Sequence, residues 1–339
     1  MTKDNHEEES NAYMDKLQEA MEEEEKNEPL SKNDQHLIVK RGKIEARFTN
    51  ILYSLTILLL IIPVLTLGSY MYYGIGDKAN HLIEVTEKTI YITKPNVSLE
   101  EMEIDSKIGF FNMDLNYSLY KRVGKNDVRI GDSEVHISLS EPDTPETNFI
   151  TDIPLTEFRD EEKEVLIHPS RGYSFNQQFA DSIIKGLPDG TVIEAFISLD
   201  QLYSEEDLVN LFPSGMDLVW YAVDTGVEEK NLSAEGDYMS PIGYPAQEDP
   251  DAWSPYNDND VNSKQFMDSL YFLEKNEATA EIIAEKPLAL KERITYLEEN
   301  GIKIYGAVVT GPKEEIVKLQ ENKLAKEIMV GEVRLWNWY

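Results

Sequence analysis

The sequence contains no cysteine among its 339 residues. Disulfide bonds, thiolate metal sites and cysteine nucleophiles are therefore excluded for any fold that the chain adopts. If part of the chain lies outside the cytosol, packing alone must stabilise it. This composition is typical of bacteria that make few exported disulfides.

Histidine is scarce, and its five positions show no metal-ligand spacing. Residues 167–174 place His168 near Ser170 and Ser174, but residues this close in sequence seldom face each other as nucleophile and base. The segment also lacks the glycine-flanked turn of a serine nucleophile. We expect structural roles here, with no catalytic residue, no metal and no cofactor. The histidines are His6, His36, His81, His136 and His168.

Charged residues are missing from residues 51–73, ILYSLTILLLIIPVLTLGSYMYY. A helix needs about 20 apolar residues to cross hydrocarbon, and this run is longer. Because a bilayer offers no water to backbone groups, the run must be helical there, and Pro63 can at most kink it. A buried core helix rarely stays apolar over this length, and a signal peptide begins within the first few residues. The run therefore predicts a transmembrane helix.

Basic residues are concentrated just before the apolar run. Lys40, Arg41, Lys43 and Arg47 precede it, whereas only Lys78 follows it closely. The positive-inside rule then places the N-terminus in the cytosol and the chain after the run outside. Tyrosines at the two ends of the run fit the aromatic belts of a bilayer interface. They are Tyr53, Tyr70, Tyr72 and Tyr73.

The formal net charge of −32 is unevenly divided. Residues 1–36 carry 4 basic and 12 acidic side chains, and residues 74–339 hold a net charge of −27. An acidic surface repels nucleic acid and anionic lipid headgroups. We therefore expect no nucleic-acid partner, and we expect contact with the lipid bilayer through residues 51–73.

Apolar residues recur at spacings of three and four within the acidic first part of the chain. A helix over about residues 10–25 would gather them on one stripe, which we predict to bind a partner. The alternative is a solvated charged segment in which the apolar residues are accidental. A second helix is predicted over about residues 32–50 and can continue into the apolar run. The stripe consists of Tyr13, Leu17, Ala20 and Met21.

After the apolar run the sequence predicts an α+β region, with a β-rich part over residues 74–160 and an α+β domain over residues 161–339. Residues 82–92 are assigned to a strand because they are rich in β-branched side chains. Residues 217–223 are strongly apolar, which is typical of a strand inside a sheet. Further strands are expected over residues 113–123, 134–140, 191–199, 302–309, 327–330 and 332–339. Helices are expected over residues 175–186, 204–212, 263–275, 287–300 and 312–320.

Two motifs suggest ligand chemistry but depart from the required pattern. Residues 306–313, GAVVTGPK, have the glycine spacing of a phosphate-binding loop, but Pro312 stands where the lysine should be. A strand-to-helix turn is the better interpretation. The acidic residues 249–262 match a calcium loop at Asp258, Asp260 and Asn262 but lack its glycine and its final glutamate. A solvated acidic loop is favoured there over a weak calcium site.

Two stretches resemble a known family. KRGKIEARFTNILYSLTILLLIIPVLTLG, residues 40–68, resembles the N-terminal sigma factor regulator segment of membrane anti-sigma factors in Gram-positive bacteria. Residues 301–339 resemble the C-terminal regulator domain of the same family, above all in the VVTGP turn and the closing LWNW. The likeness includes the type that restrains the envelope-stress sigma factor M.

The resemblance implies a single-pass transmembrane protein with a short acidic cytosolic N-terminal segment, residues 1–50, and an α+β extracytoplasmic region. In that family the cytosolic part holds an extracytoplasmic-function sigma factor away from RNA polymerase. The outer part senses the envelope or pairs with a second integral membrane protein. The alternative is a membrane-anchored extracytoplasmic ligand-binding protein or envelope enzyme unrelated to sigma factors.

Overall fold

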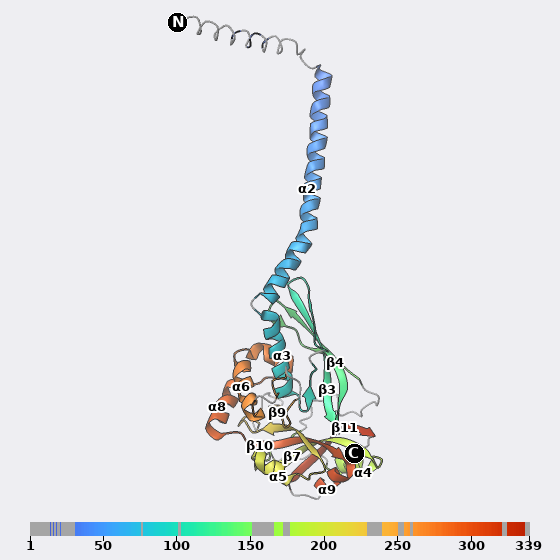
Figure 1. Cartoon of the computed structure of the whole chain (residues 1–339), viewed down its shortest axis with the longest axis vertical. Helices are drawn as coiled ribbons and strands as arrows, with labels where there is room; N and C mark the ends of the chain where they lie inside the picture. Colours follow the sequence, from blue (N-terminus) through green and yellow to red (C-terminus); the bar gives the residue numbers. More distant parts are fainter. Residues whose placement is uncertain are drawn as a thin grey trace, which may run out of the picture. The chain divides into compact units, whose positions relative to one another are not determined.

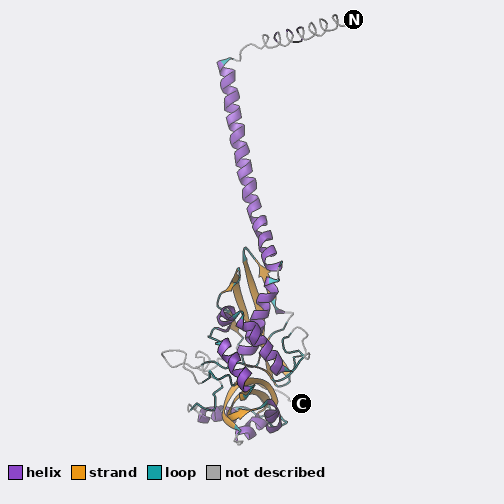
Figure 2. Ribbon diagram, turned by 90° about the vertical axis from the view of Figure 1, so that its left-hand side faces the viewer, coloured by secondary structure: helices purple, strands orange, loops and turns teal. Residues whose placement is uncertain are grey.

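The structure, a computed structural model, forms two compact units, Met1–Leu65 and Thr66–Tyr339. Its helices and strands are drawn in Figures 1 and 2. The residues that it describes are 14, 16, 18, 21, 31–75, 77–100, 103–150, 166–171, 177–228, 239–249, 254–257, 260–320 and 324–335.

Helix α2, Lys32–Gly74, contains the whole apolar run (Figure 1). Pro63 lies inside the helix without ending it. The hydroxyl of Thr56 donates to the carbonyl oxygen of Leu52 at 2.9 Å, so this polar group is satisfied within the helix. The prediction that the helix over residues 32–50 continues into the apolar run is confirmed.

Helix α3, Lys78–Thr93, replaces the strand predicted over residues 82–92, which was wrong. Its buried residues include Leu82, Val85, Thr89 and Ile90, which recur at the spacing of one helix face. Each of three threonines satisfies its hydroxyl on a carbonyl one turn earlier, for example Thr89 on Val85 at 2.6 Å. Packing on both sides of α3 therefore outweighs the β propensity of its side chains.

The first sheet has six antiparallel strands, in the order β1-β3-β4-β5, with β2 on β3 and β6 on β4. Its centre is the long pair of β3 and β4, which confirms the strands predicted over residues 113–123 and 134–140. The strands are β1 (Val97–Ser98), β2 (Asp105–Ile108), β3 (Asn112–Val123), β4 (Asn126–Ser138), β5 (Glu141–Pro142) and β6 (Glu146–Phe149).

The second sheet has five antiparallel strands in the order β11-β7-β10-β8-β9. Strand β8 lies between two others, as its apolar sequence predicted. Up to Leu335, the two final strands predicted over residues 327–330 and 332–339 are one strand, whose register shifts between Val330 and Val333. Residues 336–339 lie outside the described residues. The strands are β7 (Thr191–Tyr203), β8 (Asp217–Val223), β9 (Gly243–Pro245), β10 (Ile304–Pro312) and β11 (Ala325–Leu335).

Helices cover both sheets. Helices α6 and α7 pack against α3, whereas α4 and α9 pack against strands of the second sheet. The predicted helices are confirmed within a few residues, but α7 was not predicted. They are α4 (Gln177–Gly186), α5 (Glu205–Leu211), α6 (Asn262–Glu274), α7 (Glu277–Ala284), α8 (Leu290–Asn300) and α9 (Lys313–Gln320).

One hydrophobic cluster runs through both sheets and α3, so the second unit has a shared core. A buried carboxylate also joins the sheets. Glu194 of β7 is fully buried and accepts hydrogen bonds from Asn96 at 2.7 Å, from Lys121 at 3.0 Å and from the backbone N–H of Glu332 at 2.8 Å. Because Lys121 lies in β3 of the first sheet and Glu332 in β11 of the second, this carboxylate joins the two sheets within one compact unit.

Candidate membrane helix and its flanking sites

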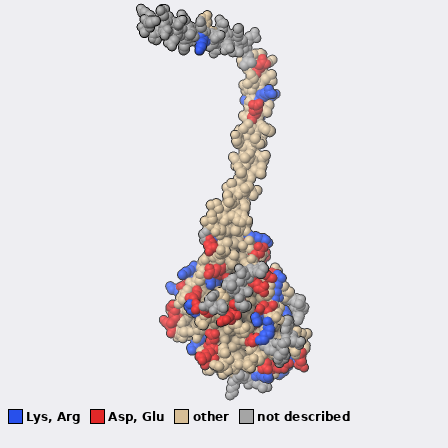
Figure 3. Space-filling view, in the orientation of Figure 1, with Lys and Arg blue, Asp and Glu red and all other residues tan. Residues whose placement is uncertain are grey.

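The apolar part of α2 lies exposed on the protein surface. None of the most apolar stretch of this helix is buried within the protein. Leu58, Leu59 and Ile62 are each more than 60% exposed. Figure 3 shows this stretch as a bare surface without charged side chains. A soluble protein would have to cover such a surface, whereas a lipid bilayer covers it at no cost in polar contacts.

The predicted topology-determining residues lie on the first half of α2 and are exposed. Lys40, Lys43 and Arg47 follow one another at spacings of three and four, which places them along one stripe of the helix. Arg41 lies beside this stripe. Long basic side chains at such a position can reach back to lipid headgroups while the helix enters the hydrocarbon.

Met21 is the member of the predicted partner-binding stripe that the structure describes. It is helical and 62% exposed, which fits a side chain available to a partner. Tyr13, Leu17 and Ala20 lie outside the described residues. The stripe therefore stays a prediction.

The last turns of α2 are clamped onto the first sheet. The hydroxyl of buried Ser69 accepts from the backbone N–H of Phe111 at 2.7 Å. Tyr73, which is 0% exposed, donates to the carbonyl oxygen of Ile137 at 3.2 Å, and the Tyr72 hydroxyl lies 2.8 Å from that of Ser140. We call Ser69, Tyr72 and Tyr73 the clamp. The assignment of Tyr73 to a lipid-facing aromatic belt is thus corrected, because its side chain is buried in protein, whereas that of Tyr72 is half-buried.

Tyr70 and Tyr53 keep the exposure that an aromatic belt requires, at 55% and 66%. The Lys78 ammonium group lies over the Tyr72 ring, 4.6 Å from its centroid, and donates to its hydroxyl at 3.2 Å. A cation and aromatic rings are thus placed where the apolar run ends, as is typical of a bilayer interface.

A buried ion pair lies in the second unit. Arg293 of α8 is 0% exposed, and its guanidinium lies 2.9 Å from a carboxylate oxygen of Glu228. It also donates to the Thr225 hydroxyl at 2.8 Å and to the carbonyl oxygens of Leu288 at 2.7 Å and Ser240 at 3.0 Å. Burial lowers the pKa of Arg293, and Glu228 opposes this shift. The pair ties α8 to the loop that follows β8.

A second polar group adjoins this pair. The Asp224 carboxylate accepts from the Tyr296 hydroxyl at 2.8 Å and from the backbone N–H of Gly226 at 3.1 Å, and the His168 imidazole lies 3.6 Å away. Burial raises the pKa of Asp224, but His168 and Tyr296 outweigh this effect and hold its pKa below the ordinary value. The other ring nitrogen of His168 contacts the Ser170 hydroxyl.

Ser170, His168 and Asp224 thus follow one another in the order of a hydrolase triad, which the sequence did not predict. The geometry favours a structural role. His168 is buried, it stacks edge-on to Tyr305 at 5.2 Å, and the 3.6 Å to Asp224 is longer than a hydrogen bond. Ser174 lies outside the described residues.

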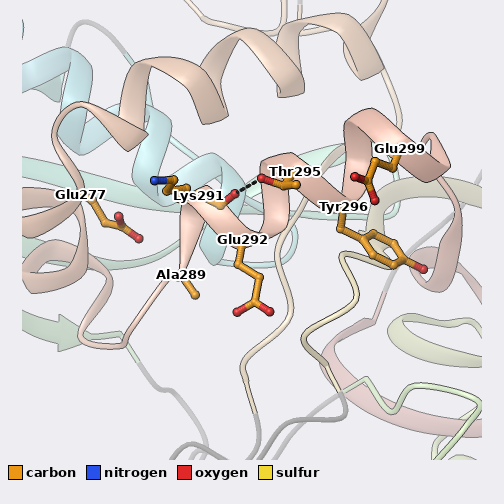
Figure 4. Close-up of a pocket in the computed structure, with 7 residues that line it drawn as sticks. All are labelled: Glu277, Ala289, Lys291, Glu292, Thr295, Tyr296 and Glu299. Carbon is orange, nitrogen blue, oxygen red and sulfur yellow. Dashed lines mark hydrogen bonds between the residues drawn. The ribbon is translucent and has the colours of Figure 1, made fainter.

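A shallow hollow lies along α8 (Figure 4). Its polar groups already serve the fold. Glu277 accepts from the backbone N–H of Leu290 at 2.6 Å, Thr295 donates to the carbonyl oxygen of Lys291 at 2.8 Å, and Tyr296 binds Asp224. The remaining carboxylates, Glu292 and Glu299, belong to an open acidic surface. We assign no ligand to this hollow.

The two motifs noted in the sequence also serve the fold. Residues 306–312 are paired strand, and α9 begins at the next residue, which confirms the strand-to-helix interpretation. In the acidic loop, Asp260 binds Lys264, and the amide of Asn262 donates to the carbonyl oxygens of Pro245 and Gln247 at 2.8 and 2.9 Å. Asp258 lies outside the described residues.

Comparison with known proteins defines the class. The sigma factor regulator N-terminal family matches residues 37–128, and the sigma factor regulator C-terminal family matches residues 184–332. A Bacillus subtilis (strain 168) protein named "Probable anti-sigma-M factor YhdL" is 32% identical over 315 residues, which cover 91% of this chain and 85% of that protein. The chain belongs to this family of anti-sigma factors, so the resemblance inferred from the sequence is confirmed. No solved structure matches the chain.

Proposed function

We propose that this anti-sigma factor is anchored in the cell membrane by residues 51–73, with its N-terminus in the cytosol. The exposed apolar surface of α2 carries this proposal, because none of its most apolar stretch is buried within the protein. About 20 residues of α2 cross the hydrocarbon. The part before the apolar run, with Lys40, Lys43 and Arg47, then lies on the cytosolic side.

The partner that we propose for residues 1–50 is an extracytoplasmic-function sigma factor, held away from RNA polymerase. Two features support this. Residues 1–36 are strongly acidic, whereas a sigma factor presents basic DNA-binding surface, so unlike charges favour encounter. An apolar stripe formed by Tyr13, Leu17, Ala20 and Met21 can then fill a groove on the partner.

Substitution within the stripe tests this function in the full-length chain. Leu17→Asp places a charge in the proposed contact and should weaken sigma factor retention at least about tenfold, as expected for a buried unpaired carboxylate. Gln18→Asp makes the same change of charge at the next residue, which is helical, exposed and off the stripe, and should leave retention unchanged.

The measurement is co-purification of sigma factors with the tagged full-length protein from membranes, identified by mass spectrometry, together with a reporter for sigma-dependent transcription. Release of transcription by Leu17→Asp and not by Gln18→Asp is the expected result. Equal behaviour of the two variants would rule out the stripe, and absence of every sigma factor from the purified complex would rule out the function.

For the outer region, residues 74–339, we propose a role in sensing the envelope or in pairing with a second integral membrane protein. The shared core and the Glu194 bridge support this, since an anchor alone requires no such domain. An envelope hydrolase is the alternative; its candidate residues would be Ser170, His168 and Asp224, although the 3.6 Å between His168 and Asp224 favours a structural role. Deletion of residues 1–36 distinguishes the two, because the hydrolase would keep its cellular phenotype and the anti-sigma factor would lose it.

A further inference from the structure

We propose that the outer region docks onto the lipid bilayer through two hairpin turns beside the clamp. These are residues 109–111, between β2 and β3, and residues 139–140, between β4 and β5; we call them the rim turns. This inference rests on the proposed function, because it requires α2 to span a membrane. It adds a second lipid contact, made by the folded domain.

The register of the first sheet brings the rim turns together. Strand β3 begins at Asn112 and β4 ends at Ser138, and these two residues are paired. The turn before β3 and the turn after β4 therefore lie at the same end of the sheet. The backbone N–H of Leu139 donates to the carbonyl oxygen of Phe111 at 3.0 Å, so one turn is hydrogen-bonded to the other.

The rim turns expose large apolar side chains where turns usually carry glycine or asparagine. Phe110 is 52% exposed and Leu139 is 48% exposed. Phe111 and Leu139 have φ values of 57° and 58°, in the left-handed region that costs such residues about 1–2 kcal/mol. Single exposed apolar residues are ordinary. Here, however, two turns that are separate in sequence present such residues at one place.

The clamp fixes the level of the rim turns along α2. If hydrocarbon begins at Ile51, about 20 residues cross it, so its outer boundary lies near Tyr70. Phe111 donates to Ser69, and a Cβ atom added at Gly68 would lie 3.7 Å from the ring of Phe111. The rim turns therefore lie at the outer boundary of the hydrocarbon, next to Tyr70.

The backbone of the rim turns suits this position. The N–H groups of Gly109, Phe111 and Leu139 donate to Asn112, Ser69 and Phe111, respectively, at 2.7–3.0 Å. An unsatisfied backbone group costs several kcal/mol near hydrocarbon, so a turn can enter the interface only when its polar groups are paired within the protein.

Charged groups frame the rim turns without entering them. Lys78 lies at the side of Tyr72, and Asp105 and Lys107 of β2 pair with each other at 3.3 Å. Asp114 and His136 pair on the first residues of the β3–β4 ladder. The groups on the sheet lie two to four residues from the rim turns, and exposed Glu141 directly follows Ser140. The rim turns themselves carry no charge, which leaves an apolar tip beside the exposed apolar surface of Leu67, Tyr70 and Met71 at the end of α2. Continuity with that surface favours lipid over a protein partner as the occupant.

The absence of cysteine makes the test direct, because one introduced cysteine carries one label. Phe110→Cys and Leu139→Cys are prepared in the full-length chain, labelled with the fluorophore NBD and reconstituted in neutral phosphatidylcholine vesicles. Parallel samples contain lipid with a shallow doxyl quencher, for positions 110 and 139, or a deep one, for position 58. We expect quenching of about twofold at both positions, with blue-shifted emission, as for side chains that enter the headgroup and acyl boundary by about 5–10 Å.

Two further labels serve as controls. Val209→Cys changes an apolar residue of α5 that is 60% exposed. Figure 1 shows α5 at the end of the second unit away from the last turns of α2, so a label there is exposed but should not contact lipid. Leu58→Cys lies inside the apolar run. The intrinsic tryptophan fluorescence, to which buried Trp220 contributes, checks that each variant is folded.

The outcomes separate the two proposals. Quenching at positions 58, 110 and 139 but not at 209 supports docking. If the label at position 58 is quenched but the labels at positions 110 and 139 are as little quenched as the label at position 209, docking is overturned and the membrane anchor stands. Absence of quenching at 58 overturns both. Because the vesicles contain no other protein, a rim that binds only a second membrane protein gives the result that overturns docking.

Discussion

Replacement of Arg293 by methionine should strongly destabilise the second unit. Methionine fills much of the same volume, so the change isolates the loss of the guanidinium from the loss of packing. The structure places this guanidinium at 0% exposure, where it makes hydrogen bonds to Glu228, Thr225, Leu288 and Ser240. All four partners lose a donor at once.

The magnitude follows from what stays buried. Glu228 is 1% exposed and would remain as a charge without its cation, and breaking a buried pair in this way costs about 3–5 kcal/mol. Glu228 still accepts hydrogen bonds from the backbone N–H groups of Thr225 and Val227 at 2.9 and 3.1 Å. The loss of stability should therefore lie toward the lower end of the range of about 3–5 kcal/mol. A further Glu228→Gln change removes the stranded charge and should recover part of it.

Thermal unfolding of the full-length protein in detergent, followed by intrinsic tryptophan fluorescence, to which buried Trp220 contributes, measures this loss. A cost of about 3–5 kcal/mol corresponds to a fall in Tm of roughly 6–20 °C for a unit of this size. Arg129→Met is the matched control, because Arg129 pairs with Asp132 at 2.5 Å on the exposed surface of β4 and should give no measurable change.

The reasoning would be refuted by a fall in Tm no larger for Arg293→Met than for Arg129→Met. It would also be refuted if the double variant with Glu228→Gln were less stable than the single variant. Either result would mean that Glu228 is adequately solvated or satisfied by its own loop.

Three further predictions concern the second unit. Asp224→Asn should remove the stabilisation that the ionised Asp224 carboxylate gives the folded state. That stabilisation is fully present above the unfolded-state pKa of about 3.9 and is lost as the pH falls through the lower folded-state pKa. In urea unfolding at several pH values, the difference in unfolding free energy between the parent protein and the variant should therefore shrink in acid, and a difference that stays constant would contradict this. Gly243→Ala should cost about 1–3 kcal/mol or more, because a Cβ atom there would lie 1.8 Å from the carbonyl oxygen of Tyr221; an unchanged Tm would show that β9 shifts freely. Ser204→Ala removes the cap that accepts from the Asp207 N–H and should cost about 1 kcal/mol in urea unfolding, whereas Ser204→Thr should cost less; equal losses would exclude capping.

Much of the fold could be predicted from local pattern. The apolar run, the helix over residues 204–212 and the apolar strand β8 each have a signal within a few residues, and the structure places them as expected. The prediction for α3 was wrong because the sequence pattern there is ambiguous. Residues 82–93 are rich in β-branched side chains, and only tertiary packing on both sides favours a helix.

The polar sites of the second unit could not be predicted, because they join residues far apart in sequence. Arg293 lies in the charged helix sequence LKERITYLEEN, where an arginine is normally exposed, yet it is fully buried. The clamp has only a weak indication in the sequence, which is that Ser69 is a polar residue near the end of an apolar run. A hydroxyl there suggests a protein contact, but its partner Phe111 lies in a turn that only the tertiary structure brings close.

The clamp also bears on how the anchor can be cut. A protease binds its substrate in an extended form, so a peptide bond in the last turns of α2 must leave the helix before cleavage. Unwinding there breaks the contacts of Ser69 and Tyr73 with the first sheet. Cleavage at the outer end of the anchor would therefore require release of the clamp from that sheet, and a ligand that holds the rim turns against the clamp would protect the bond from a distance.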